Sequence, residues 1–143
     1  MVRRPVDLAE LRRMRLRELK SMGREKIQQG INKAETADWK NDSVIARKIQ
    51  QHQLEWGRDN ITIEEFKEIS KRIKSNPDSI IYTYIHDAFP HHRGYCFISP
   101  EGEVIHYRAD ENLNKSCHKP KDLEKYLSGR IHWIQVTRKG EIV

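Results

Sequence analysis

The stretch Ser79–Arg108 constrains the fold of this chain most strongly. It reads SIIYTYIHDAFPHHRGYCFISPEGEVIHYR, in which three short runs rich in Ile, Val, Tyr and Phe are separated by turn residues. Polarity alternates from residue to residue within each run, which is typical of strands with one buried face. We therefore expect neighbouring antiparallel strands, and these form the centre of the predicted fold.

The second and third runs predict a hairpin. Arg93–Ser99 and Glu103–Arg108 flank Pro100-Glu101-Gly102, and glycine supplies the positive φ that such a loop needs. Pairing Ser99 with Glu103 places Tyr95, Phe97, Ile105 and Tyr107 on one face and Cys96, Ile98, Val104 and His106 on the other, with Arg108 beyond. We expect the first face to be core and the second to carry chemistry, although a slip of one residue would exchange them.

The remaining chain predicts four helices and two further strands. Helices are expected over Asp7–Gln29, from Asp42 or Ser43 to about Trp56, from Thr62 to Asn76-Pro77, and from Pro120 to Gly129. Strands are expected over Ser79–Ile85 and Arg130–Thr137, while Ile31–Asn41 is expected to be a connection and Asp110–Lys119 to be irregular. The fold class predicted is α+β: N-terminal helices, then a small antiparallel sheet of about four strands, with one helix inserted before the last strand.

Positive charge is concentrated near the N-terminus. The net charge is +6, and nine Lys/Arg face four Asp/Glu between Arg3 and Lys26. This pattern predicts a basic helical arm and connection over residues 1–41, attached to a single α+β domain over residues 42–143. Such an arm suits a polyanion, and its candidate nucleic-acid-binding residues are Arg12, Arg13, Arg17, Lys20 and Arg24. The alternative is a solvated surface helix.

The composition argues against a membrane, disulfide or cofactor protein. No apolar run approaches the roughly 20 residues that span a bilayer, and two cysteines form no disulfide framework. We expect a soluble, cytoplasmic protein with no membrane partner. Glycine-rich phosphate loops are absent, and a zinc site from Cys96, His106, Cys117 and His118 would lack the usual ligand spacing. We therefore expect no cofactor and no metal, and the oligomeric state stays open.

Two histidines are candidate catalytic residues. His52 lies on a helical stripe with Ile45, Ile49 and Trp56, where a buried structural histidine is the alternative. His106 lies near Arg108 on the mixed hairpin face. A histidine that moves a proton beside an arginine that neutralises phosphorane charge is a workable phosphodiester site.

Aromatic and basic residues also interleave in the C-terminal half. Arg93, Tyr95 and Tyr107 are candidates for holding phosphates and stacking bases on an open sheet face. The alternative is that these tyrosines close the core.

The element order from Arg47 to Lys139 resembles the barnase/EndoU/colicin/RelE-like group of small ribonucleases. His52 precedes a helix, Asn76-Pro77-Asp78 leads into the strands, and the last strand ends with Thr137 and Arg138. The resemblance implies metal-free RNA cleavage by scattered His, Arg, Lys and Thr/Ser side chains. By this resemblance His52, Arg108, Thr137 and Arg138 join His106 as candidate catalytic residues.

The leading hypothesis is a small basic protein that binds nucleic acid, RNA ahead of DNA, with a metal-independent ribonuclease as its enzymatic form. The alternative is a non-enzymatic interaction protein, of the kind that a phage or mobile element encodes, whose basic arm docks on an acidic surface of a host protein or a larger assembly. Both predict a basic surface, so charge alone does not separate them.

Overall fold

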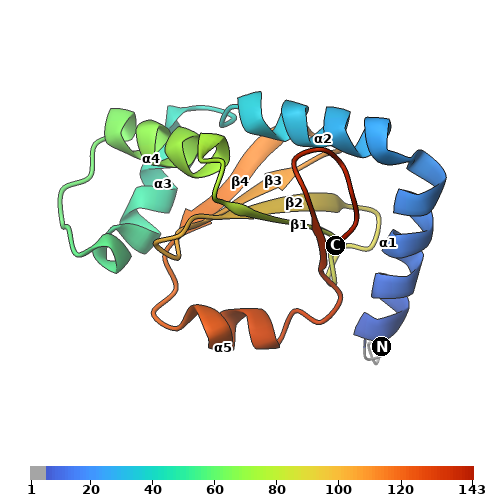
Figure 1. Cartoon of the computed structure of the whole chain (residues 1–143). Coiled ribbons are helices and arrows are strands. Elements are labelled where there is room, and N and C mark those ends of the chain that lie inside the picture. The colour runs from blue at the N-terminus through green and yellow to red at the C-terminus, as the bar shows by residue number, and fades with distance from the viewer. Residues whose placement is uncertain (1–5) are drawn as a thin grey trace.

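The computed structural model of the chain describes residues 6–143 and has the predicted α+β architecture (Figure 1). The helices are α1 (Leu8–Met22), α2 (Arg24–Thr36), α3 (Asp42–His52), the short 3-10 helix η1 (Gln53–Trp56), α4 (Ile63–Ser75) and α5 (Leu123–Ser128). The strands are β1 (Ile80–Ile85), β2 (Arg93–Ile98), β3 (Val104–Arg108), β4 (Leu113–His118) and β5 (Ile134–Val136). As predicted, one helix precedes the last strand.

The five strands form one antiparallel sheet in the order β4-β3-β2-β1-β5. The predicted hairpin register is confirmed, because Cys96 lies opposite His106 and the Ser99 amide donates to the Glu103 carbonyl at 2.9 Å. The expectation that Asp110–Lys119 is irregular was wrong, since it contains β4. β4 has the polar sequence LNKSCH. It lies at an edge of the sheet and is mostly half-buried, so polar side chains can be accommodated there.

Helices lie on both faces of the sheet (Figure 1). α2, α3 and α4 cover one face, where the main core includes Phe66, Phe97 and Ile105. α5 lies on the other face over a smaller core. That core contains Tyr84, Cys96, Ile98, Val104 and Trp133. The two hairpin faces therefore separate as expected, and the second face is left partly open beside α5.

The N-terminal segment is two helices rather than the single helix predicted. Gly23 separates α1 from α2 with φ at +83°, a conformation that favours glycine. α2 then continues to Thr36, where a connection was expected, because Ile27, Ile31 and Ala34 form a buried stripe at helical spacing. Because polar residues separate these three positions, the stripe was not recognised from the sequence.

Both N-terminal helices share the core of the sheet. Leu19 and Ile27 are buried in the same cluster as Phe97, and α1 lies against β1 and β5. Arg15 is buried as well, and its guanidinium donates to the Thr83 hydroxyl at 2.9 Å. The proposed arm over residues 1–41 thus packs on the sheet from Leu8 onward, while its first five residues lie outside the described part of the chain.

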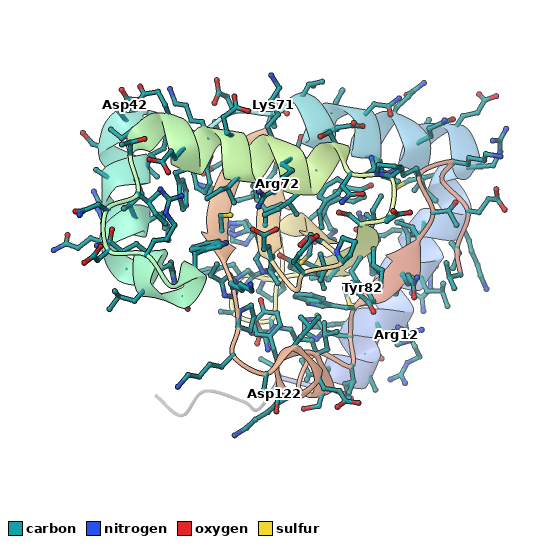
Figure 2. The ribbon with its side chains drawn as sticks, turned by 60° about the vertical axis from the view of Figure 1, so that its left-hand side comes forward. Arg12, Asp42, Lys71, Arg72, Tyr82 and Asp122 are labelled. Atoms are coloured by element: carbon teal, nitrogen blue, oxygen red, sulfur yellow. The ribbon has the colours of Figure 1, made fainter. Side chains whose placement is uncertain are left out.

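Buried polar contacts fasten the hairpin loop to the helices. Glu103 is 3% exposed and accepts hydrogen bonds from Trp56 Nε1 at 3.0 Å and from Arg72. Figure 2 shows Arg72 on α4, facing the sheet. α4 begins with a capping box formed by Thr62 and Glu65, whereas α5 begins at Leu123, with Asp122 as its cap, and not at Pro120 as predicted. Within residues 6–143, no helix combines the length and apolarity that crossing a membrane requires.

Candidate active site

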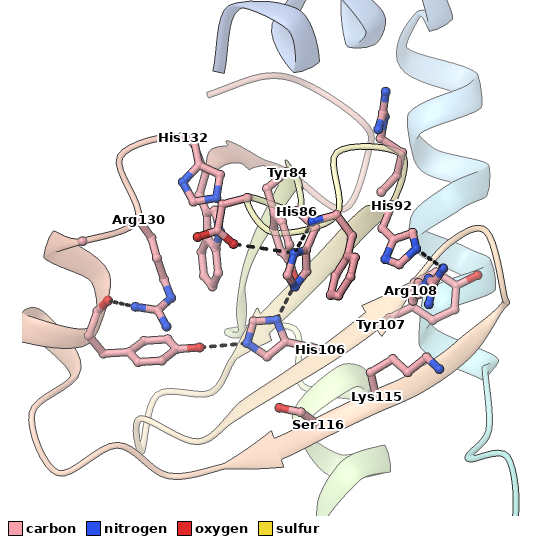
Figure 3. A pocket seen from close by; sticks show the side chains of 17 residues that line it. Tyr84, His86, His92, His106, Tyr107, Arg108, Lys115, Ser116, Arg130 and His132 are labelled. Carbon is pink, nitrogen blue, oxygen red and sulfur yellow. Dashed lines mark hydrogen bonds and ion pairs between the residues drawn. The ribbon is translucent and has the colours of Figure 1, made fainter. Parts of the chain in front are cut away.

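A pocket of about 490 Å³ opens on the sheet face that α2, α3 and α4 leave uncovered (Figure 3). Its lining comes from β1, β2, β3 and β4, the β1–β2 loop, α5 and the turn that leads into β5. The arginine, lysine and histidine residues of the lining are Arg93, Arg108, Lys115, Arg130, His86, His92, His106 and His132. Asp87 is the lone carboxylate among the lining residues. This excess of basic side chains favours an anionic ligand.

His106 lies on the pocket floor between two tyrosines. Its Nδ1 atom is 2.6 Å from the Tyr84 hydroxyl, and its Nε2 atom is 2.8 Å from the Tyr126 hydroxyl (Figure 3). Burial, with help from the nearby His118, lowers the pKa of His106 to about 3, so the ring is neutral at physiological pH. A neutral imidazole has one N–H, so one tyrosine must donate to the ring and the other must accept from it.

The burial of the two tyrosines selects one of these arrangements. Tyr84 is 7% exposed and stacks on Trp133 with ring centroids 4.7 Å apart, so a free O–H there would be buried without an acceptor. That would cost about 1–3 kcal/mol. We therefore assign Tyr84 as the donor to Nδ1, and Nε2–H as the donor to Tyr126. The hydroxyl hydrogen of Tyr126 is then left for the pocket.

Arg130 lies directly beside Tyr126. Its guanidinium carbon is 3.7 Å from the centre of the Tyr126 ring, and Nη1 donates to the Tyr126 carbonyl at 2.7 Å. Among residues 6–143 no carboxylate lies within ion-pair distance of Arg130, whereas Arg93 pairs with Glu18 and Arg108 pairs with Asp110. Arg130 is thus the pocket arginine whose charge is left for a ligand. Burial raises the pKa of Tyr126, which keeps its hydroxyl protonated as a donor.

His132 supplies a neutral imidazole to the same pocket. It is 4% exposed, and burial lowers its pKa below the ordinary value. In the described part of the chain its Nδ1 atom has no hydrogen-bond partner, so no contact fixes which nitrogen carries the proton. A neutral ring with a free lone pair can accept a proton. Figure 3 shows His132 and Arg130 on the same side of the pocket.

The structure brings some of the predicted site residues together. Four of them line the pocket: Arg93, His106, Tyr107 and Arg108. His52 lies at the end of α3, where Nδ1 is 3.1 Å from Glu55, and it reaches the pocket only through His118, whose ring is 5.5 Å from that of His52 and 5.9 Å from that of His106. His52 is therefore at the edge of the sheet rather than in the pocket.

The residues after β5 form structural contacts instead. The Thr137 hydroxyl accepts from the Glu141 amide at 3.1 Å, which shapes the C-terminal turn. Arg138 donates to the carbonyls of Lys74 and Asn76 and thereby ties this turn to the end of α4. Neither residue lines the pocket, so the structure does not support the sites that the ribonuclease resemblance implied for them.

The predicted nucleic-acid-binding residues divide into buried and exposed groups. Tyr95 and Tyr107 are 2% and 3% exposed and belong to the main core, so neither ring presents an open face to a base, contrary to the expectation, although Tyr107 also borders the pocket. Arg12 donates to the Trp133 carbonyl, and Arg13 pairs with Glu10. Three residues are exposed and lack a carboxylate within ion-pair distance anywhere in residues 6–143. These are Arg17, Lys20 and Arg24.

Sequence reasoning did not identify Tyr126, Arg130 or His132 as site residues. They meet only because α5 and the turn after it fold back over the sheet face that bears His106. The one signal in the sequence is that Tyr126, with Leu123 and Leu127, lies on the apolar face of the helix predicted from Pro120. Cys96 lies in the smaller core and Cys117 in the main core, on opposite faces of the sheet, and both are free thiols.

Metal-ligating side chains do not converge on the pocket. In residues 6–143, no three His, Cys, Asp or Glu side chains are grouped as a metal ion would require. The groups that converge are an arginine, two tyrosines and several neutral histidines, which can bind an anion and move protons. Comparison of the chain with protein-family models, with curated proteins and with solved structures finds no match.

Proposed function

We propose that the chain binds RNA and cleaves it without a metal ion, with the pocket beside α5 as its active site. One observation carries the proposal: Arg130 has no carboxylate partner among the described residues, and it lies against Tyr126 in a pocket that also holds His132. An unpaired guanidinium matches the charge of a phosphodiester, and its fork suits the phosphate oxygens. The adjacent hydroxyl and imidazole are groups that can transfer protons.

The proposed reaction is a transesterification. His132 accepts the proton of the RNA 2′-hydroxyl, whose oxygen attacks the adjacent phosphorus. Arg130 binds the non-bridging oxygens and stabilises the charge of the phosphorane. As the bond from phosphorus to the 5′ oxygen breaks, Tyr126 gives its hydroxyl proton to that oxygen. The products are a 2′,3′-cyclic phosphate and a free 5′-hydroxyl, and water returns the proton from His132 to Tyr126.

His106 acts as a positioning residue in this scheme. Its Nε2–H, 2.8 Å from the Tyr126 oxygen, stabilises the phenolate that forms when Tyr126 gives up its proton. The guanidinium of Arg130 above the ring adds a favourable charge. Because the low pKa of His106 keeps the ring neutral, this hydrogen bond persists over the physiological pH range.

The exposed basic residues of α1 and α2 are proposed to add affinity. Arg17, Lys20 and Arg24 carry charge into solvent, and binding to phosphates through such side chains depends on salt. Replacing all three with Gln should make the fall of log affinity with log salt concentration less steep. The expected decrease is about 0.7 for each phosphate of a single strand that the variant no longer neutralises.

The test uses labelled RNA and DNA of one sequence, with chelator present. Wild type is expected to bind both and to cut only RNA, because DNA lacks the attacking hydroxyl. Arg130→Gln should weaken binding and His132→Gln should abolish cleavage. The control Lys40→Gln removes one exposed charge outside the pocket and should change little. If neither polymer binds at about 50 mM salt, where phosphate contacts are strong, the proposal fails and an acidic protein becomes the partner to seek.

A further inference from the structure

The β1–β2 loop presents an exposed aromatic ring at the pocket. Phe89 is 49% exposed and lines the pocket, and it is the one aromatic residue among the large apolar side chains that are exposed in residues 6–143. An exposed phenyl ring forgoes the free energy that burial would provide. An exposed ring beside a basic pocket is suited to a ligand that has both a flat apolar face and negative charge.

Backbone hydrogen bonds hold this loop in a fixed conformation. His86 Nδ1 accepts from the amides of Ala88 at 3.0 Å and Phe89 at 3.2 Å. The His92 amide donates to the Phe89 carbonyl at 2.9 Å, and the His86 amide donates to the His92 carbonyl at 3.0 Å. The loop is thus preorganised, so a ligand that binds it loses little free energy in ordering it.

Two imidazoles support the phenyl ring itself. His92 stacks on Phe89 with ring centroids 5.1 Å apart and an interplanar angle of 27°, and His86 lies 5.3 Å away. His92 in turn contacts the guanidinium of Arg108 through Nε2. Arg93 donates to the Pro90 carbonyl at 2.6 Å and so ties the loop to β2. The aromatic platform, which we define as Phe89 with His92 behind it, is fixed to strands that carry the pocket's basic residues.

We propose that the aromatic platform stacks a nucleobase and restricts the substrate to single-stranded RNA. This rests on the proposed function, because the phosphate of the same strand would occupy the site at Arg130. Exposed aromatic rings beside basic grooves are the usual means of holding single strands, since each base offers a flat face. In a duplex both faces of each base are covered by neighbouring bases, so no face is free for Phe89.

The test compares two uncleavable ligands with the same number of phosphates. One is a 2′-O-methyl RNA of about 12 nucleotides, a length within the usual site size, and the other is the same strand without its bases. Phe89→Ala should weaken binding of the strand with bases by about 5-fold to 150-fold and should leave the abasic strand within about 2-fold. Phe89→Trp should restore binding, and Leu54→Ala, at an exposed apolar residue outside the pocket, is the control.

The outcomes separate this inference from the function on which it rests. If wild type binds neither strand, the proposed function fails. If wild type binds both strands and Phe89→Ala binds them equally well, the inference alone is overturned, and Phe89 is left to contact a protein. Equal affinity of wild type for single-stranded and duplex RNA would also overturn it.

Discussion

The Nε2 atom of His106 lies 2.8 Å from the hydroxyl oxygen of Tyr126, and this contact joins the sheet to α5 across the pocket. His106 belongs to β3, so its position is set by strand pairing, whereas Tyr126 is set by the short α5. The hydrogen bond therefore fastens a six-residue helix to a strand in the interior of the sheet. Its removal should affect both stability and the proposed chemistry.

Tyr126→Phe tests this contact directly. The variant leaves the buried Nε2–H of His106 without its acceptor, so we expect unfolding free energy to fall by about 1–3 kcal/mol. RNA cleavage should fall by about 100-fold or more because the proposed acid is missing. Urea unfolding and a cleavage time course measure the two effects. Tyr82→Phe is the control, since Tyr82 packs on the same smaller core without a hydrogen bond to His106. Equal behaviour of the two variants would refute the assignment.

The stability of the protein should decrease in mild acid. Burial lowers the pKa of His118 to about 4 and that of His106 to about 3, against an ordinary value of 6.5. Below pH 6.5 the unfolded chain therefore binds more protons than the folded one, and stability falls as pH falls. Each histidine should contribute a loss of about 2 kcal/mol between pH 6.5 and pH 5.

Unfolding in urea at these two pH values measures the acid effect. His118→Gln should show a smaller loss than wild type, because one of the buried rings with a lowered pKa is gone. His91→Gln, which removes an exposed histidine from the β1–β2 loop, serves as the control and should follow wild type. Equal losses of stability in His118→Gln and wild type would contradict the assignment of the acid effect to His118.

Lys74 predicts that stability also rises with pH in the alkaline range. It is 2% exposed, and its ammonium donates to the Ala37 carbonyl at 2.7 Å and to Asn114 at 2.9 Å. Burial lowers its pKa to about 8 from 10.5. Between these values the unfolded chain binds more protons, so this group adds stability as pH rises. Relative to Lys74→Met, wild type should gain about 2 to 3 kcal/mol from pH 8 to pH 10.

The comparison with Lys74→Met removes the other alkaline titrations, since both proteins share their tyrosines and cysteines. Lys71→Met, at an exposed position on the same helix (Figure 2), should leave the pH dependence of unfolding as in wild type. Parallel stability curves for wild type and Lys74→Met would show that the ammonium is not the source of the trend.

Gly94→Ala should disrupt the pocket through Tyr84. A Cβ atom at Gly94 would lie 2.5 Å from the Tyr84 ring, so that ring would have to move away from His106. We expect a loss of about 1–3 kcal/mol, as for other overpacked sites, together with weaker RNA cleavage. Gly129→Ala is the matched control, because Gly129 lines the same pocket and its added Cβ meets nothing within 4 Å. A stable, active Gly94→Ala protein would contradict this account.

The sequence predicted the hairpin and its two faces well because that information is local. Alternation fixed which residues share a face with His106, and the loop Pro100-Glu101-Gly102 fixed the register. Edge strand β4 was missed because half-exposed strands need little apolar sequence. The C-terminal part of α2 was not predicted because its buried stripe consists of only three residues.

The pocket was harder to predict because it depends on long-range contacts. Arg130 and His132 flank a turn, and no periodic pattern shows that this turn folds over β3. Tyr95 and Tyr107 illustrate the opposite error: their residue types suggested base stacking, but their strand positions had already placed them in the core. Residue type was less informative than the face on which each side chain lies.

The packing of α1 against β5 affects the order in which the parts of the fold can be completed. Arg12 donates to the Trp133 carbonyl, 121 positions later in the sequence, and β5 also completes the sheet edge beside β1. α1 therefore cannot complete its packing until β5 has paired with β1. Native contacts that span most of the sequence form slowly, because a long stretch of chain must close before they can form. We expect the docking of α1 to be among the late steps of folding, after β5 has joined the sheet.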